Sequence, residues 1–90
     1  HNPKSTIRNL FWGFDIDAVR AADAPGVSAP NPTGLSAVEF CALAAIAGAD
    51  SRTKIIEFSE MNPTFDIDGR TARLAATALH RFCAAVSGNN

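Results

Sequence analysis

Residues 6–14 read TIRNLFWGF, a run of bulky apolar side chains that is followed directly by Asp15-Ile16-Asp17. Residues 53–59 read TKIIEFS and lead in the same way into Glu60-Met61-Asn62-Pro63. Short apolar runs bounded by polar or turn residues predict buried strands. In a parallel sheet the carboxyl ends of the strands form one edge, where ligands bind. We therefore expect both acidic segments to lie on one rim, where a hard metal ion or a cationic substrate would neutralise them.

A loop and a helix are predicted between the two strands. Residues 20–34 contain three prolines and two glycines, which predict an irregular loop. Ser36-Ala37-Val38-Glu39 is a capping box, in which both side chains accept hydrogen bonds from backbone N–H groups. The helix is expected to run to Ala47 and to stop at Gly48. Because apolar residues surround it almost completely, it should pack on more than one side.

A second helix is predicted to follow residues 65–68 and Gly69 and to end near Ser87-Gly88. Asp68 is the expected N-cap, and Asp66 should interact favourably with the helix dipole. Residues 65–68 repeat the tetrapeptide Phe-Asp-Ile-Asp of residues 14–17, which we attribute to chance. Steps of three and four residues define the predicted apolar stripe of this helix, which consists of Ala72, Ala75, Ala76, Leu79, Phe82, Cys83 and Val86.

The order strand, loop, helix, strand, helix is a βαβα unit, whose natural setting is an α/β fold with a parallel sheet. Such sheets are covered on both faces and contain several strands. The 90 residues make at most one domain, and two strands do not complete a sheet of this kind. We therefore expect residues 1–90 to be the C-terminal fragment of a single domain, incomplete on its own.

Composition excludes several classes of protein. The net charge is −1 and the basic residues are dispersed, which argues against a nucleic-acid-binding surface. No apolar run approaches the roughly 20 residues that span a bilayer, so no membrane segment is predicted. Cys41 and Cys83, the only two cysteines, lie in apolar stretches and are predicted to be buried free thiols. This usage fits a reducing compartment such as the cytoplasm.

Asp15 and Asp17 are candidate metal ligands. In an extended segment, residues two apart project from the same face. Two carboxylates so close repel each other unless a cation lies between them. Pairs of divalent ions bridged by carboxylate and water are a known hydrolytic arrangement. The alternative is that both are cap or loop aspartates that face solvent.

Glu60 is a candidate substrate-binding residue. A carboxylate held before a rigid Asn-Pro turn can grip a planar amidine or guanidinium through two parallel hydrogen bonds. The alternative is an ion pair with Arg70 or Arg73. Glu57, in the middle of the predicted strand, would need a polar partner if it were buried. His80 is expected to have a surface or packing role.

Together these motifs resemble the C-terminal part of the ureohydrolase superfamily, which contains arginase, agmatinase and formimidoylglutamase. The matching segments follow the family order across nearly the whole chain: Phe14-Asp15-Ile16-Asp17, Ala24-Pro25-Gly26-Val27-Ser28-Ala29-Pro30, Gly34-Leu35, Glu60-Met61-Asn62-Pro63 and Asp68-Gly69-Arg70-Thr71-Ala72-Arg73-Leu74-Ala75.

The resemblance implies a three-layer α/β/α sandwich with a parallel sheet, the arginase-like fold. It implies a site with two Mn²⁺ ions, in which Asp15 and Asp17 are metal ligands and Glu60 holds the amidine or guanidinium group of a small-molecule substrate. The family's other metal ligands, which come earlier in its sequences, have no counterpart here. The remainder of the polypeptide would therefore complete both the sheet and the metal site.

Two departures from the family pattern bear on the substrate. Arginases and agmatinases continue the metal motif with a third Asp and a Pro, where this chain has Arg20 and Ala21. They also carry Gly-Thr-Pro in the loop, where this chain has Ser28-Ala29-Pro30. The loop is more similar to that of formimidoylglutamases. The resemblance therefore favours hydrolysis of N-formimino-L-glutamate to L-glutamate and formamide.

Other functions stay open at this point. Within the enzyme class, the alternative is an arginase or agmatinase that releases urea. Outside it, the alternative is a non-catalytic α/β module that binds a cation at the acidic rim. The sequence also leaves the oligomeric state open, a homo-oligomer included.

Overall fold

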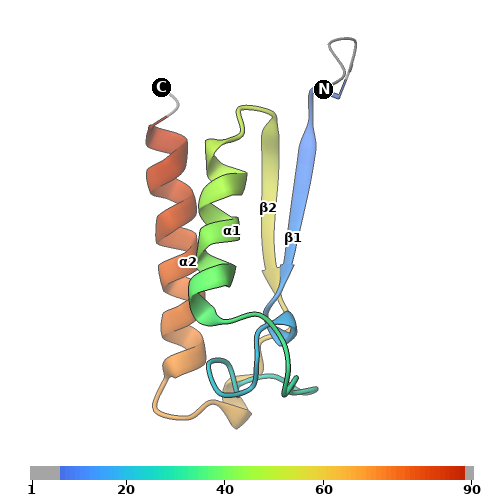
Figure 1. Cartoon of the computed structure of the whole chain (residues 1–90), viewed down its shortest axis with the longest axis vertical. Helices are drawn as coiled ribbons and strands as arrows, with labels where there is room; N and C mark the ends of the chain where they lie inside the picture. Colours follow the sequence, from blue (N-terminus) through green and yellow to red (C-terminus); the bar gives the residue numbers. More distant parts are fainter. Residues whose placement is uncertain (1–6, 89–90) are drawn as a thin grey trace.

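The computed structural model describes residues 7–88 and contains the predicted order of elements (Figure 1). The bounds, in chain order, are β1 (Leu10–Asp15), the 3-10 helix η1 (Ile16–Ala18), α1 (Ala37–Ala49), β2 (Thr53–Ser59), the 3-10 helix η2 (Pro63–Phe65) and α2 (Arg70–Ser87). The second strand has its predicted bounds, and the last helix ends where predicted. The first strand begins later than predicted, at Leu10, and Thr6 lies outside the described residues.

β1 and β2 form a parallel pair, as predicted, in which Phe11 lies opposite Ile55 and Phe14 opposite Phe58. Side chains alternate between the two faces of a strand. The face with Phe14 and Phe58 packs against the helices, whereas Phe11 and Ile55 are 61% and 57% exposed. Within residues 7–88, therefore, helices cover one face of the sheet and leave the other bare.

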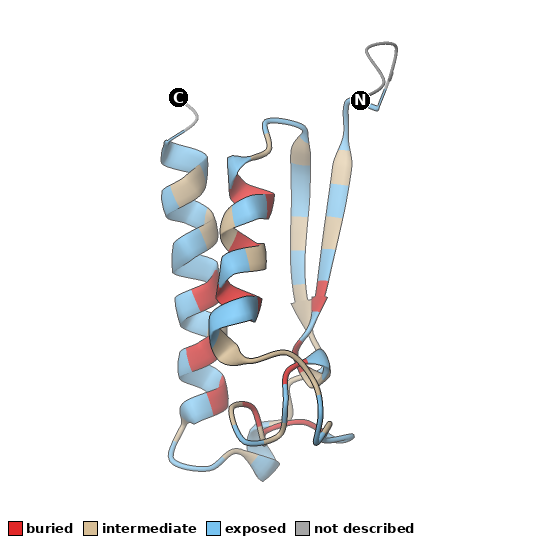
Figure 2. Ribbon diagram, in the orientation of Figure 1, coloured by how far each residue is buried: buried red, intermediate tan, exposed pale blue. Residues whose placement is uncertain are grey.

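The core is built around Phe14, near the end of β1. Its ring packs edge-on against Phe40 of α1, with 5.5 Å between centroids, and stacks on Phe58 of β2 at 5.4 Å. Offset and edge-to-face arrangements of this kind add to the energy of burial. Figure 2 shows the buried positions on α1, around the end of β1 and along the first half of α2. The end of β1 that carries Asp15 is thus anchored by aromatic packing.

The capping box that begins α1 is confirmed. Glu39 N–H donates to Ser36 Oγ at 3.1 Å, and Ser36 N–H donates to the Glu39 carboxylate at 2.9 Å. The helix also packs on two sides, as predicted: Phe40 contacts the sheet, and Gly48 lies against α2. Val38 and Ile46 are nevertheless exposed.

The prediction that α1 stops at Gly48 is wrong, because the helix continues through Gly48 to Ala49. A Cβ on Gly48 would collide with the backbone carbonyl of Phe82 in α2. Glycine therefore lets two helices approach closely here, and it does not terminate the first one.

The apolar stripe of α2 is partly as predicted: Ala75 and Phe82 pack against the core, but the most deeply buried positions lie one residue earlier than predicted. The buried residues are Thr71, Leu74 and Ala78, whereas Leu79 is 46% exposed. Cys83 is exposed as well, so the expectation of two buried thiols is right for Cys41 and wrong for Cys83. The fully buried residues of α2, Thr71 and Ala78, have small side chains, and these allow the helix to pack closely against α1. Neither α2 nor any other helix within residues 7–88 is long and apolar enough to cross a lipid bilayer.

Candidate active site

The carboxyl ends of the two strands form the predicted rim. Asp15, the last residue of β1, lies opposite Ser59, the last residue of β2. The Ser59 hydroxyl donates a hydrogen bond of 2.7 Å to Asp15 Oδ1. Glu60 follows immediately, so the sheet register places the start of both acidic segments at the same edge.

The backbone conformation at Asp17 differs from the predicted one. It lies in η1 and not in an extended segment, so the expectation that Asp15 and Asp17 share a strand face is wrong. The turn is fixed by Ile16 and Val19, which are both almost fully buried. Asp17 is thus held between two buried residues, Ile16 and Val19, and lies two residues beyond the end of β1.

The carboxylates of Asp15 and Asp17 form no ion pair with a basic side chain within residues 7–88. Asp15 is exposed and Asp17 is half-buried. The ion pairs formed within residues 7–88 involve Asp23, Asp50 and Asp68, and none of them reaches the rim. Two uncompensated carboxylates supply the hard oxygen ligands that divalent cations such as Mn²⁺ prefer.

These two aspartates are suitable ligands for a metal ion, but two carboxylates are too few to complete its coordination. The part of the chain that the structure describes contains no cluster of three or more His, Cys, Asp or Glu side chains arranged around one point. Divalent cations usually take more ligands than two carboxylates supply. A complete metal site therefore needs ligands from outside residues 7–88.

Glu60 has an unusual backbone conformation, with φ at 70°. A non-glycine residue in this left-handed region costs about 1 kcal/mol or more, and such residues cluster at functional sites. The alternative of an ion pair with Arg70 or Arg73 is wrong, because both guanidinium groups bind Asp68. Glu60 is exposed, and its carboxylate makes no ion pair within the described chain.

The loop at residues 26–28 packs directly against the turn that follows Glu60. Val27 and Met61 form an antiparallel bridge, and Asn62 N–H donates to the carbonyl oxygen of Gly26 at 2.6 Å. Asn62 Nδ2 donates to Ser28 Oγ at 3.0 Å. Sequence reasoning identified both segments as motifs but not this contact between them. Their shared family resemblance was the one signal that could have suggested it.

The second copy of Phe-Asp-Ile-Asp has a structural role. The N-cap position of α2 is Gly69, and the carboxylate of Asp66 accepts hydrogen bonds from the first turn, from Thr71 N–H at 2.9 Å and Ala72 N–H at 3.2 Å. Partial burial opposes ionisation of Asp66, but these hydrogen bonds outweigh it and lower its pKa. Asp68 binds Arg70, and that hydrogen bond lowers the pKa of Asp68. The prediction that Asp68 is the N-cap is therefore wrong.

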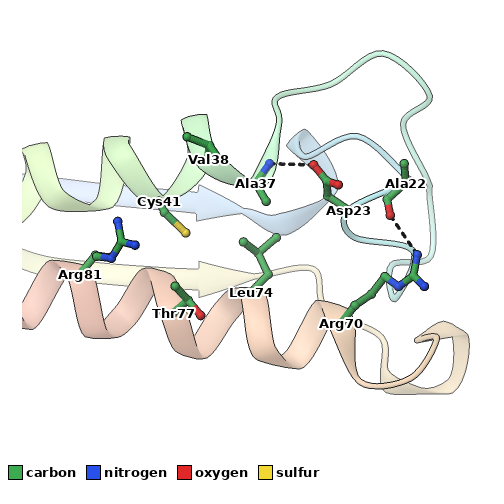
Figure 3. A pocket seen from close by; sticks show the side chains of 9 residues that line it. All are labelled: Ala22, Asp23, Ala37, Val38, Cys41, Arg70, Leu74, Thr77 and Arg81. Carbon is green, nitrogen blue, oxygen red and sulfur yellow. Dashed lines mark hydrogen bonds between the residues drawn. The ribbon is translucent and has the colours of Figure 1, made fainter.

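A cavity of about 520 Å³ lies away from the rim, between α1, α2 and the loop after η1 (Figure 3). Its Asp23 accepts hydrogen bonds from Arg20 and from Ala37 N–H, which together lower the pKa of Asp23. Its thiol, Cys41, has its pKa raised by burial, so it stays protonated and weakly nucleophilic. None of Asp15, Asp17 or Glu60 lines this cavity.

Glu57 and His80 lie outside the rim. Glu57 is exposed, so it needs no buried partner. His80 is exposed on α2, in agreement with the surface role expected for it.

Comparison with known proteins identifies the family of this chain. A family model described as the arginase family matches residues 2–84. The formimidoylglutamase of Rhodococcus opacus is 39% identical over 77 residues, which cover 86% of this chain and 24% of that protein. That of Aromatoleum aromaticum is 40% identical over 84 residues, covering 86% and 25%. The chain thus spans about a quarter of the length of these relatives.

Solved structures give the same result. The formiminoglutamase of Trypanosoma cruzi, crystallised with Mn²⁺, superposes with a TM-score of 0.88 at 31% identity, over 92% of this chain and 28% of that one. An arginase from Bacillus subtilis superposes less closely, with a TM-score of 0.78 at 25% identity, over 83% of this chain and 26% of that one. The two strands and two helices are therefore part of the larger fold that these enzymes share.

Proposed function

The chain belongs to the arginase family, and on that premise we propose that the full-length protein hydrolyses a C–N bond of a linear amidine at a site with two Mn²⁺ ions. The favoured substrate is N-formimino-L-glutamate, which yields L-glutamate and formamide. The chain described here supplies part of that site, and the rest of the polypeptide supplies the remaining ligands.

One observation carries the proposal: the parallel register brings Asp15 and the start of the Glu60 turn to one rim, and no basic side chain of residues 7–88 forms an ion pair with either carboxylate. Elsewhere in the described chain, four ion pairs tie other carboxylates to arginines. Free carboxylates at the ends of parallel strands favour a ligand that is itself positive. A metal centre beside a cationic substrate meets both requirements.

Asp15 and Asp17 would hold the metal ions. Manganese bound there would supply a water of lowered pKa as the nucleophile. Ser59, which donates to Asp15 Oδ1, leaves the second oxygen of that carboxylate available and fixes the plane of the group. Asp17 lies between Ile16 and Val19, whose burial would hold its backbone in place.

Glu60 would hold the amidinium group of the substrate. Its two oxygens can accept hydrogen bonds from two N–H groups of a planar cation, and this fixes the orientation of the carbon under attack. The strained backbone at Glu60 supports this role, because the surrounding contacts maintain a conformation that glutamate does not otherwise prefer.

The choice of substrate rests on the relatives and the loop. The relatives from Rhodococcus opacus and Aromatoleum aromaticum, which share about 40% identity with this chain, are formimidoylglutamases, and the arginase superposes less closely than the formiminoglutamase. The loop sequence Ser28-Ala29-Pro30 also lies beside the Glu60 turn, since Ser28 bonds Asn62. A loop in contact with the substrate-holding segment is well placed to affect which amidine binds.

A product assay tests the proposal. The full-length, Mn²⁺-loaded protein is offered N-formimino-L-glutamate, arginine and agmatine in separate reactions. We expect glutamate and formamide from the first and no urea from the other two. Urea from arginine or agmatine would contradict the substrate, and no turnover of any of the three with two Mn²⁺ bound would contradict the enzyme activity.

A further inference from the structure

Asn62, two residues after Glu60, forms hydrogen bonds through its backbone N–H and through both ends of its side-chain amide. Its N–H donates to the carbonyl oxygen of Gly26 at 2.6 Å, and its Nδ2 donates to Ser28 Oγ at 3.0 Å. Its Oδ1 accepts from Thr64 N–H at 3.1 Å, and this fixes which end of the amide faces Ser28. One side chain thus ties the Glu60 turn both to the following 3-10 helix and to a loop more than thirty residues away.

That loop is itself fixed to the body of the protein. Gly26 N–H donates to Thr71 Oγ1 at 2.8 Å, and Thr71 is fully buried at the start of α2. A Cβ on Gly26 would lie 2.9 Å from Thr71 Oγ1, so the backbone must pass close to the helix at this point. Val27, 1% exposed, adds an apolar anchor beside Met61. Hydrogen bonds therefore link Thr71 of α2 to Gly26, and Gly26 to Asn62.

Glu60 needs such a restraint from its neighbours. Its φ of 70° is unfavourable for glutamate, and its side chain makes no hydrogen bond or ion pair within residues 7–88 that would hold it in place. A backbone in this region persists only where the surroundings impose it. The bridge at Met61 and the hydrogen bonds of Asn62 are the contacts that flank it on its C-terminal side.

We propose that Asn62 is a positioning residue for Glu60, and that its hydrogen bond to Ser28 couples the orientation of the Glu60 carboxylate to the 26–28 loop. The inference rests on the proposed function, because it takes Glu60 as the group that holds the amidinium. Asn62 touches neither substrate nor metal in this account and acts through the turn that it fixes.

The chain provides a matched control. Asn31 makes the same local turn, in which its Oδ1 accepts from Thr33 N–H at 3.0 Å. Like Asn62 it is half-buried, but its hydrogen bonds within residues 7–88 join it to Thr33 and Ala21 and not to the Glu60 turn. Replacing either asparagine by alanine removes a turn of the same kind, so the difference between the two variants isolates what Asn62 does for Glu60.

The test is a double-mutant cycle in the full-length, Mn²⁺-loaded protein. Asn62→Ala should lower kcat/KM about tenfold with manganese content unchanged, and Ser28→Ala about threefold, the effect of one neutral hydrogen bond. Ser28→Thr, which keeps the hydroxyl, should restore the activity, and Asn31→Ala should stay within about twofold of the parent. In the Glu60→Gln background, Asn62→Ala and Ser28→Ala should each have almost no further effect.

The cycle separates the two ideas. Equal factors for Asn62→Ala with and without Glu60→Gln would overturn the positioning role and leave the proposed function standing. An unchanged kcat/KM in Glu60→Gln alone would overturn both the role of Glu60 and this inference. Ser28→Ala removes only a surface hydroxyl, so it gives a result even if Asn62→Ala fails to fold; kcat/KM unchanged by Ser28→Ala would contradict the coupling to the loop.

Discussion

The tetrapeptide Phe-Asp-Ile-Asp occurs twice in this chain, and the two copies have different environments. At residues 14–17 it ends β1, and the two aspartates lie at the rim without arginine partners in the described chain. At residues 65–68 it precedes α2, where Asp66 accepts hydrogen bonds from the first backbone N–H groups of the helix. Asp68 there is paired with Arg70 and Arg73.

The difference shows that a carboxylate is available for a ligand only when the fold leaves it unsatisfied. The free N–H groups at a helix N-terminus and two nearby guanidinium groups satisfy the second pair. The end of a parallel strand offers the first pair neither kind of partner beyond the hydroxyl of Ser59. Identical sequence therefore has a structural role in one place and, in our proposal, a metal-binding role in the other.

The largest effect is expected from Asp17→Asn in the full-length protein. Loss of a charged metal ligand should reduce kcat/KM by more than about 100-fold, beyond the 10- to 100-fold typical of residues that only support a ligand. Asp68→Asn, at the matching position of the second copy, should leave kcat/KM nearly unchanged. Steady-state kinetics at saturating Mn²⁺ measure both, and equal losses would remove the distinction between the copies.

Glu60→Gln should have the next largest effect. A hydrogen bond to a charged group contributes more than a neutral one, so we expect kcat/KM to fall about 10- to 100-fold while two Mn²⁺ stay bound. The control is Glu57→Gln, which changes an exposed glutamate three residues earlier on β2. Loss of manganese from Glu60→Gln would mean that Glu60 belongs with the metal ligands and not with the substrate.

Ser59→Ala should weaken Mn²⁺ binding about tenfold, because the hydroxyl holds Asp15 Oδ1 at 2.7 Å. The affinity is measured by titrating the metal-free protein with Mn²⁺ and following the free ion by electron paramagnetic resonance. Ser51→Ala, in the turn before β2, is the control. Parent-like affinity in Ser59→Ala would show that the orientation of Asp15 does not depend on this contact.

Asp66→Ala should affect stability and not chemistry. Removing the carboxylate that accepts from Thr71 N–H and Ala72 N–H leaves these groups in the first turn of α2 without this acceptor, so we expect Tm to fall by a few degrees. Manganese content should remain that of the parent. Differential scanning calorimetry and metal analysis on the same preparation test this, and loss of metal would contradict a purely structural second copy.

The smallest effect is on pH dependence. The pKa values of Asp66 and Asp68 are lowered in the folded chain, so their stabilising contribution is present above the unfolded value of about 4. It is lost as pH falls below 4 through the folded pKa values. Below pH 4 the parent should therefore lose stability more steeply than Asp66→Ala in urea unfolding. Parallel profiles would show that Asp66 is not ionised more readily in the folded protein.

Local signals were sufficient to predict much of this fold. The apolar run of β2 and the Ser36 capping box are confirmed, because each depends on residues that are adjacent in sequence. Gly48 was misinterpreted because its role depends on Phe82, a partner on the other helix. The α2 stripe is only partly as predicted for the same reason: Ala75 and Phe82 pack against the core, but the packing of α1 determines which residues are most deeply buried.

The candidate site, too, could be predicted from the sequence only in part. The parallel register could be predicted, and with it the approach of Asp15 to the Glu60 turn. The 3-10 conformation at Asp17 could not be predicted, since it depends on the burial of Ile16 and Val19 in the core. Nor could the bond between Asn62 and Ser28, because no local pattern encodes a contact across 34 residues.

The most direct test of the central claim, that only the strand-end copy binds metal, is the manganese content of two double variants of the full-length protein. Metal analysis compares Asp15→Asn/Asp17→Asn with Asp66→Asn/Asp68→Asn after identical loading with Mn²⁺. We expect the first variant to lose bound manganese and the second to keep two ions per chain. Two ions retained by the first variant, or lost from the second, would contradict it.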